Sequence, residues 1–117
     1  MAYADYRPLF AEAMDPRFYN IEYLDKRLID GTADYFESRN AAIIVEIKTF
    51  PAGARAVAGL VAAGDMHEIV NDLIPSAEAW GKAQGCQFGM IESRPGWEKA
   101  MKPHGYNVFQ VSIIKEI

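Results

Sequence analysis

The sequence contains a single cysteine, Cys86, in 117 residues. One thiol excludes an intramolecular disulfide and any zinc site built from several cysteines. The two histidines, His67 and His104, are far apart and have no partner at ligand spacing, so we expect no metal site. We predict that Cys86 packs as a small buried apolar side chain, with a reactive thiol as the alternative.

Clusters of positive charge are also lacking. The chain has 12 Lys and Arg against 16 Asp and Glu, which gives a net charge of −4. The nearest approach to a basic cluster is Lys99, Lys102 and His104. Because phosphate backbones are bound by clustered Lys and Arg, we expect no nucleic-acid binding.

No long apolar run is present. A membrane span needs roughly 20 consecutive apolar residues, and no stretch approaches that length. The opening residues, MAYADYRPLF, lack the cationic region and apolar run of a secretory signal. We therefore expect a soluble, intracellular protein that does not bind membranes.

What the sequence does have is apolar periodicity, which begins with helical spacing. Half of the residues are apolar, enough for one core, so we predict a single domain over residues 1–117. Pro8 is predicted to open a short helix that ends before Pro16. Asn20 is predicted to cap a second helix that runs to about Asp30. Residues 1–18 are either a peripheral docking segment or part of the domain.

From about Ala33 the apolar period changes to 2, which is typical of strands. The segments DYFES, AAIIVEIKTF and ARAVAGLVA predict three strands of an antiparallel meander. Asp65 is predicted to cap a helix that reaches Gly85 and breaks near Ile74, because Pro75 lies inside it. A strand at CQFGMIE, a short helix over residues 96–102 and a last strand over residues 106–117 complete the chain.

The element order is therefore α-β-β-β-α-β-α-β. A meander followed by a βαβ unit predicts an α/β domain with a mixed, mainly antiparallel sheet of about five strands. We expect helices on both faces of that sheet.

This order resembles the GNAT fold of acyl-CoA N-acyltransferases over roughly residues 20–117. More narrowly, AEAWGKAQGC followed by IESRPGWEKAMKPHGY is similar to small GNAT-like proteins of phage and prophage genomes. The resemblance implies a cytoplasmic or virion-associated protein. It also implies acetyl-CoA or another acyl-CoA as the cofactor if the chain is an enzyme.

The resemblance places the coenzyme between the strands at about Arg55–Ala62 and Cys86–Glu92. Its diphosphate would bind free N–H groups at the turn and helix start that follow the first strand. Only Gly64 suits a close backbone approach, whereas Asp65, as a helix cap, would occupy the same N–H groups and Glu68 adds a second negative charge. The implied cofactor-binding residues are Val61, Ala62, Ala63, Gly64, Asp65 and Met66.

The catalytic residues implied by the resemblance are incomplete. Many GNAT enzymes have a tyrosine that protonates the departing thiolate, and the matching position here is Met101, which has no exchangeable proton. Glu46 is the only acid within the apolar run of the meander. It is a candidate base acting through a water, or it faces solvent or pairs with a neighbour such as Lys48.

The stretch IESRPGW contains a further candidate, Arg94. At the end of a strand beside the coenzyme site, Arg94 is able to grip a carboxylate or phosphate. The alternative is a simple strand-to-helix corner, in which Pro95 and Gly96 shape the backbone and Trp97 fills the core. Trp80 shares its helical phase with Leu73 and Ala77, so we predict that it packs in the core or at an interface.

Two functional hypotheses follow. The first is a phage-type GNAT-like protein with incomplete acyltransfer machinery, which acts in binding or assembly and associates with itself or with another phage-derived protein. The second is an acyl-CoA N-acyltransferase that transfers an acyl group to an amine. The aromatic N-terminal segment either covers one sheet face or docks onto another subunit, and its members are Tyr3, Tyr6, Phe10, Phe18, Tyr19 and Tyr23.

Overall fold

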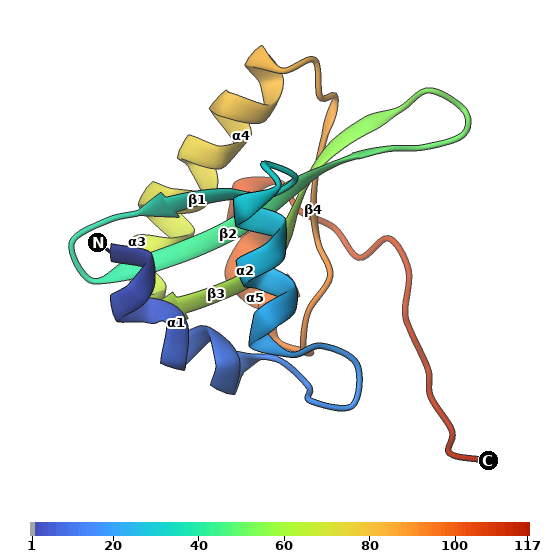
Figure 1. Ribbon diagram of the computed structural model, residues 1–117. Helices are drawn as coiled ribbons and strands as arrows, with labels where there is room; N and C mark the ends of the chain where they lie inside the picture. The colour runs from blue at the N-terminus through green and yellow to red at the C-terminus, as the bar shows by residue number, and fades with distance from the viewer. Residues whose placement is uncertain (1) are drawn as a thin grey trace.

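A four-stranded sheet in the order β1-β2-β3-β4 organises the computed structural model, which describes residues 2–117 (Figure 1). β1 (Asp34–Glu37), β2 (Ala41–Thr49) and β3 (Arg55–Gly64) form the expected antiparallel meander. β4 (Phe88–Ile91) runs parallel to β3. The prediction of a mixed, mainly antiparallel sheet in an α/β domain is confirmed.

Two helices cover one face of the sheet (Figure 1). α2 (Ile21–Ile29) begins as predicted, because the Asn20 side chain accepts a hydrogen bond from the Tyr23 N–H. α1 spans Ala2–Ala13, so the prediction that Pro8 opens a helix was wrong. Pro8 lies inside α1. The helix is stabilised there by Phe10, which is fully buried against Leu24 and Ile44.

The other face is covered by a broken helix and a short one (Figure 1). α3 (Met66–Glu68), the π-helical turn η1 (Ile69–Leu73) and α4 (Ile74–Ala83) follow one another without a gap. The predicted break near Ile74 is confirmed, because its N–H bonds to the Ile69 carbonyl, one residue further back than in an α-helix. α5 (Trp97–Met101) and the 3₁₀ turn η2 (Lys102–His104) follow β4.

Side chains from both strands and helices fill the core on the α4 face. Trp80 and Trp97 are partly buried against it, as predicted, and Trp80 also meets Phe36 edge-on. Cys86 packs against the same core but is only half-buried. The buried members of this cluster are Ala41, Ile43, Val45, Val57, Ile69, Leu73 and Ala77.

The expected fifth strand, over residues 106–117, does not form. This part of the chain has no regular secondary structure and stands away from the sheet (Figure 1). A strand exists only through hydrogen bonds to a neighbour, and residues 107–117 pair with no strand within residues 2–117. The alternating apolar residues are present in the sequence, but the prediction that they form a strand of this sheet was wrong.

None of the helices in residues 2–117 combines the length and apolar character needed to cross a bilayer.

Candidate functional site

β3 and β4 pair only over a short stretch and then separate. Their register runs from Ala56 opposite Phe88 to Gly59 opposite Ile91, whereas β3 itself continues to Gly64. A cleft of about 540 Å³, including its open mouth, lies on the α4 side of this separation. Apolar residues dominate its lining, which includes Val57, Leu60, Val61, Ala62, Ile69, Ile74, Met90, Ile91 and Trp97.

A β-bulge lies at the point where the strands separate. Ile44 of β2 pairs with Val61 and the next residue, Val45, pairs with Gly59, so Leu60 has no counterpart. As a result, Leu60 and Val61 both pack against the core on the α1 and α2 face. A bulge disrupts the strand's regular hydrogen bonding, and bulges are common beside active sites.

A second cavity lies on the opposite face of the sheet, beneath α1 and α2. Its lining is more polar and consists of Met14, Tyr19, Tyr23, Leu24, Glu46, Lys48, Gly59, Leu60 and Glu92. Gly59, Leu60 and Glu92 also line the apolar cleft. The two cavities therefore share a wall at the bulge.

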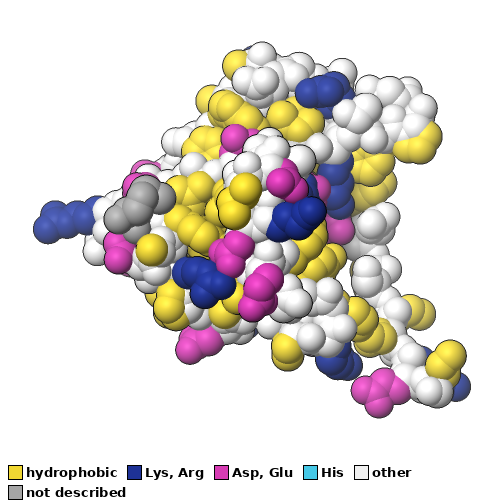
Figure 2. Space-filling view, in the orientation of Figure 1, with side chains coloured by type: hydrophobic (Ala, Val, Ile, Leu, Met, Phe, Trp, Pro, Cys, Tyr) yellow, Lys and Arg dark blue, Asp and Glu magenta, His cyan; other side chains and the backbone are white. Residues whose placement is uncertain are grey.

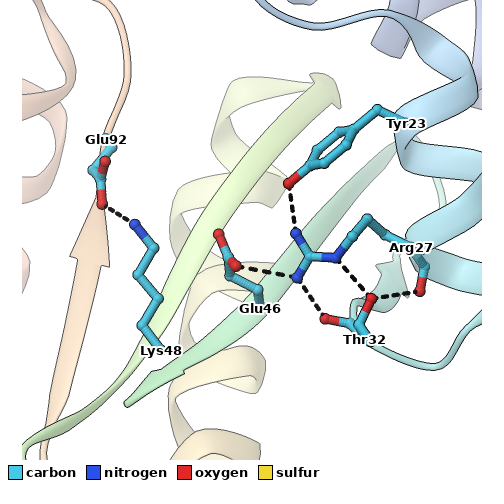
Figure 3. A network of polar contacts seen from close by, with 6 residues as sticks. All are labelled: Tyr23, Arg27, Thr32, Glu46, Lys48 and Glu92. Atoms are coloured by element: carbon cyan, nitrogen blue, oxygen red, sulfur yellow. Dashed lines mark hydrogen bonds and ion pairs between the residues drawn. The ribbon is translucent and has the colours of Figure 1, made fainter. Parts of the chain in front are cut away.

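Two ion pairs border the second cavity (Figure 3). Arg27 donates to Glu46 over 3.1 Å and to the Tyr23 hydroxyl over 2.5 Å. Burial opposes the charge on Arg27, but these two hydrogen bonds outweigh it and raise the pKa of the guanidinium. Lys48 donates to Glu92 over 2.5 Å, and this bond raises the pKa of the Lys48 ammonium. Both cations therefore stay charged and hold the two carboxylates in place.

Glu46, the sequence candidate for a base, is thus placed at this cavity with its side chain only 16% exposed. The expected alternative of a Glu46–Lys48 pair was wrong: Glu46 binds Arg27, and Lys48 binds Glu92. β2 brings Glu46 and Lys48 to the same face as predicted. Their partners come from α2 and from the end of β4, which the local sequence does not reveal.

Arg94 lies in the connection between β4 and α5 and is exposed. It lines neither cavity. Among residues 2–117 it makes no side-chain hydrogen bond or ion pair, so the structure does not bring it to Glu46.

The turn after β3 binds to its own chain. Gly64 has a φ of +101°, and a Cβ there would lie 2.3 Å from the Asn40 carbonyl oxygen. Glycine is therefore required for contact with the β1–β2 turn, a different reason from the coenzyme approach that the sequence suggested. The Asp65 N–H donates to the same carbonyl, and the Asp65 carboxylate accepts from the Glu68 N–H as expected of a cap.

Glu68 points toward the β1–β2 turn. Its carboxylate accepts hydrogen bonds from the Ser38 hydroxyl and from the backbone and side-chain N–H groups of Asn40. These bonds, the Ser38 bond first, lower the pKa of Glu68. The amides of Met66 and His67 are the helix-start N–H groups left without a partner in the described chain.

Tyr106 places a phenol in the apolar cleft. It donates a hydrogen bond to Glu78 of α4 over 2.6 Å, and burial, followed by that bond, raises its pKa. Gly89 of β4 leaves room for it, since a Cβ there would lie 2.5 Å from the phenol oxygen. Met101, at the position where the resemblance implies a tyrosine, is buried in the core.

Sequence reasoning missed Tyr106, Glu78 and Glu92 as site residues. Glu92 carried a usable signal, because ligands commonly bind beyond the carboxyl ends of parallel strands and Glu92 directly follows β4. Tyr106 and Glu78 are far apart in sequence and carried none. No group of three or more His, Cys, Asp or Glu able to hold a metal ion occurs within residues 2–117.

Several solved structures that superpose on this chain are described as acetyltransferases. The ribosomal-protein-alanine N-acetyltransferase of Brucella melitensis biovar Abortus 2308 superposes with a TM-score of 0.69 at 15% identity, over 98% of this chain and 91% of that one. A predicted acetyltransferase of Clostridium acetobutylicum, solved with acetyl-CoA, gives 0.67 at 12% identity, over 94% and 83%. Glucosamine-6-phosphate N-acetyltransferase of Arabidopsis thaliana gives 0.65 at 12% identity, over 95% and 88%. The chain has the GNAT fold.

Sequence comparison adds one relative of a different description. A protein of Syntrophomonas wolfei subsp. wolfei, described as ribosomal protein L11 methyltransferase, is 37% identical over 86 residues. The match covers 71% of this chain but only 26% of that protein, so the chain spans about a quarter of the relative's length. No family model matches the chain.

Proposed function

We propose that this chain is an acyl-CoA N-acyltransferase that transfers an acyl group to an amine. The observation that carries the proposal is the wall shared by the two cavities at the bulge, formed by Gly59, Leu60 and Glu92. It allows a thioester in the apolar cleft and an amine in the polar cavity to approach from opposite faces of the sheet. The activity in the name of the longer Syntrophomonas protein is not carried over to this chain.

The apolar cleft fits the uncharged arm of an acyl-CoA, which when bound supplies an activated acyl thioester. At the diphosphate end, fewer backbone N–H groups are available to bind the coenzyme. The Asp65 carboxylate already accepts one helix-start N–H, and the Met66 and His67 amides are the ones that remain to hold an anion. The Glu68 carboxylate is hydrogen-bonded to Ser38 and Asn40, not to these amides.

The remaining roles belong to side chains that line the two cavities. Glu46 and Glu92 hold carboxylates that can accept a proton from an amine, directly or through a water. Arg27 and Lys48 fix their positions through the ion pairs. On the other face, Tyr106 keeps a proton at its phenol oxygen inside the cleft.

Ligand binding tests this proposal most directly. Acetyl-CoA at 100 times its dissociation constant should stabilise the chain by about 2.7 kcal/mol, a rise of several degrees in melting temperature. Gly59→Leu should abolish the shift, because the new side chain would occupy the cleft that Gly59 lines. A Cβ at Gly59 meets nothing within 4 Å, so the fold itself should tolerate it. Ala52→Leu adds a similar bulk at the exposed hairpin and is the matched control.

Turnover is the second measurement. Release of free thiol from acetyl-CoA in the presence of a panel of primary amines should be detectable. Glu46→Gln and Glu92→Gln each remove one candidate base. The rate of thiol release should fall by on the order of 100-fold in the variant that has lost the base. No melting shift at millimolar acetyl-CoA and no thiol release would reject the proposal.

A second candidate is a binding or assembly role without acyl transfer. Met101 and the Asp65 cap favour it. Met101 stands where the resemblance implies a phenol, and the Asp65 carboxylate accepts a helix-start N–H that a phosphate would otherwise bind. Under this candidate, acetyl-CoA causes no melting shift and the chain associates with itself or with another phage-derived protein. The phage or prophage origin rests on the resemblance of AEAWGKAQGC and IESRPGWEKAMKPHGY to such proteins, and the genes beside this one would test it.

A further inference from the structure

The charged side chains that line the polar cavity beneath α1 and α2 keep hydrogen-bonding capacity that the protein does not use. One oxygen of Glu46 accepts from Arg27, and one oxygen of Glu92 accepts from Lys48 (Figure 3). The second oxygen of each carboxylate accepts from no group within residues 2–117. The Lys48 ammonium has three N–H donors and uses one of them within the same residues. Both carboxylate oxygens and ammonium protons therefore remain for a ligand.

The charges at this cavity balance. Glu46 is paired with Arg27 and Glu92 with Lys48, so the two ion pairs sum to zero. On the molecular face that carries α1 and α2, side chains of both signs are intermixed (Figure 2). A polyamine or a diacid is attracted by an excess of the opposite charge, and the two ion pairs provide none. The cavity suits a ligand that carries both charges and is neutral overall.

The rest of the cavity lining is largely apolar or aromatic. The rings of Tyr19 and Tyr23 lie with their centroids 5.3 Å apart, and Met14, Leu24 and Leu60 supply aliphatic surface. Aromatic rings of this kind pack favourably against other rings. The cavity measures about 490 Å³ including its open mouth, which is within the range of roughly 300–1,000 Å³ found for small-molecule sites. It therefore has room for one large apolar side chain beside the charged groups.

We propose that the polar cavity binds a free α-amino acid with an aromatic or large aliphatic side chain. Its carboxylate binds the unused N–H groups of Lys48, and its ammonium binds the unused oxygens of Glu46 and Glu92. Glu46 and Lys48 are two positions apart on β2, so their backbones are about 7 Å apart on one face of the strand. They form no ion pair with each other, which leaves both ends of an amino acid a partner. The side chain of the amino acid then lies against Tyr19 and Tyr23.

The role of this amino acid as the acyl acceptor rests on the acyltransferase function proposed above. Bound as an ammonium, it loses one proton to a carboxylate at the cavity, directly or through a water, and this proton passes to solvent. The free amine attacks the thioester carbonyl carbon, so that a C–N bond forms and the C–S bond breaks. The second proton lost by the nitrogen balances the one taken up by the departing thiolate. The products are an N-acyl amino acid and a free thiol.

Calorimetric titration without any coenzyme tests the binding. L-phenylalanine should bind more tightly than L-phenylalaninamide, which keeps the amine, the carbonyl and the ring but lacks the negative charge. It should also bind more tightly than 3-phenylpropanoate, which lacks the amine. Each difference should be on the order of 10-fold or more, because each analogue leaves a charged group of the cavity without its partner. No binding of L-phenylalanine at millimolar concentration would overturn the proposal. Equal or tighter binding of the amide would also overturn it, and would favour a peptide N-terminus as the ligand.

A variant of Lys48 tests which group recognises the carboxylate. In Lys48→Met the preference for L-phenylalanine over its amide should fall to near unity, whatever the overall affinity. Lys82→Met is the matched control, because Lys82 is exposed on α4 and lines neither cavity, and it should keep the preference. Circular dichroism checks that both variants are folded. A preference that survives Lys48→Met would overturn the proposal.

Mass spectrometry separates this inference from the proposed function. With acetyl-CoA present, formation of N-acetylphenylalanine would support both. Selective binding of L-phenylalanine without any N-acetylphenylalanine would support the amino-acid site and count against acyl transfer to it. Acetylation of amines that lack a carboxylate, at the rate of L-phenylalanine or faster, would support acyl transfer and overturn the amino-acid site.

Discussion

The Tyr106 phenol donates a 2.6 Å hydrogen bond to Glu78 across the cleft between β3 and β4. The two residues come from α4 and from the segment after η2, and Gly89 makes room for their contact. This places an exchangeable proton in the cleft although Met101 supplies none. The chain therefore has a phenol at the candidate site, from a position other than the one the resemblance implies.

Removal of this phenol should slow acyl transfer more than it weakens binding. Tyr106→Phe keeps the ring over Gly89 and deletes only the proton donor, so we expect kcat to fall by on the order of 100-fold. KM for acetyl-CoA should change little, and initial-rate measurements separate the two.

Gly89→Ala provides an independent check on the same bond. The new Cβ would lie 2.5 Å from the phenol oxygen, at the movable end of the Tyr106 side chain, and should displace it from Glu78. We expect its rate to resemble that of Tyr106→Phe. Full activity in both variants would assign the phenol a purely structural role.

Tyr106 should also shape stability at alkaline pH. Burial and the Glu78 bond raise its pKa above the unfolded value of 10.0, so folding favours the protonated phenol. Its contribution to the free energy of unfolding is fully present below pH 10 and is lost as the pH rises toward the folded pKa. Urea unfolding between pH 8 and about 11 should thus show a steeper decline for the wild type than for Tyr106→Phe. Parallel declines would contradict the raised pKa.

Glu68 should affect stability at acidic pH in the opposite sense. Its bonds to Ser38 and Asn40 lower its pKa below the unfolded value of 4.5. The folded state is therefore favoured above pH 4.5, and this contribution is lost as the pH falls through the lower folded pKa. Glu68→Gln should flatten the acid limb of the unfolding curve. Glu12→Gln, at an exposed position of α1, should leave the limb unchanged.

Local patterns predicted the elements better than their partners. The Asn20 cap, the meander and the break before Pro75 depend on neighbouring residues, and the sequence is sufficient for them. The pairing of Glu46 with Arg27 joins β2 to α2, so no spacing rule identifies it. Pro8 was misread because its local preference for a helix start is outweighed by the burial of Phe10.

The candidate site, too, has some features that the sequence predicted and others that it did not. The acidic cap at Asp65 followed from the local sequence, and the missing phenol at Met101 followed from the position that the resemblance implies. The shared wall, the Tyr106–Glu78 bond and the unpaired segment 107–117 all depend on where distant segments meet. Alternation in that segment predicts that it can be a strand, but only a partner edge decides whether it becomes one.

Gly64 offers a test of how tightly the turn after β3 is fixed. Gly64→Ala places its Cβ 2.3 Å from the Asn40 carbonyl oxygen and 2.7 Å from the Ala41 Cα, both backbone atoms that cannot move independently. Gly53→Ala is the matched control, because its φ of +97° is close to the +101° of Gly64 while its Cβ meets nothing within 4 Å. We expect the control to lose about 1–2 kcal/mol from backbone strain alone, and Gly64→Ala to lose roughly 3–4 kcal/mol because the clash is added. Urea denaturation of both variants measures the difference. Equal losses would mean that the β1–β2 turn yields, and the amides after Gly64 would then be free to move toward a ligand.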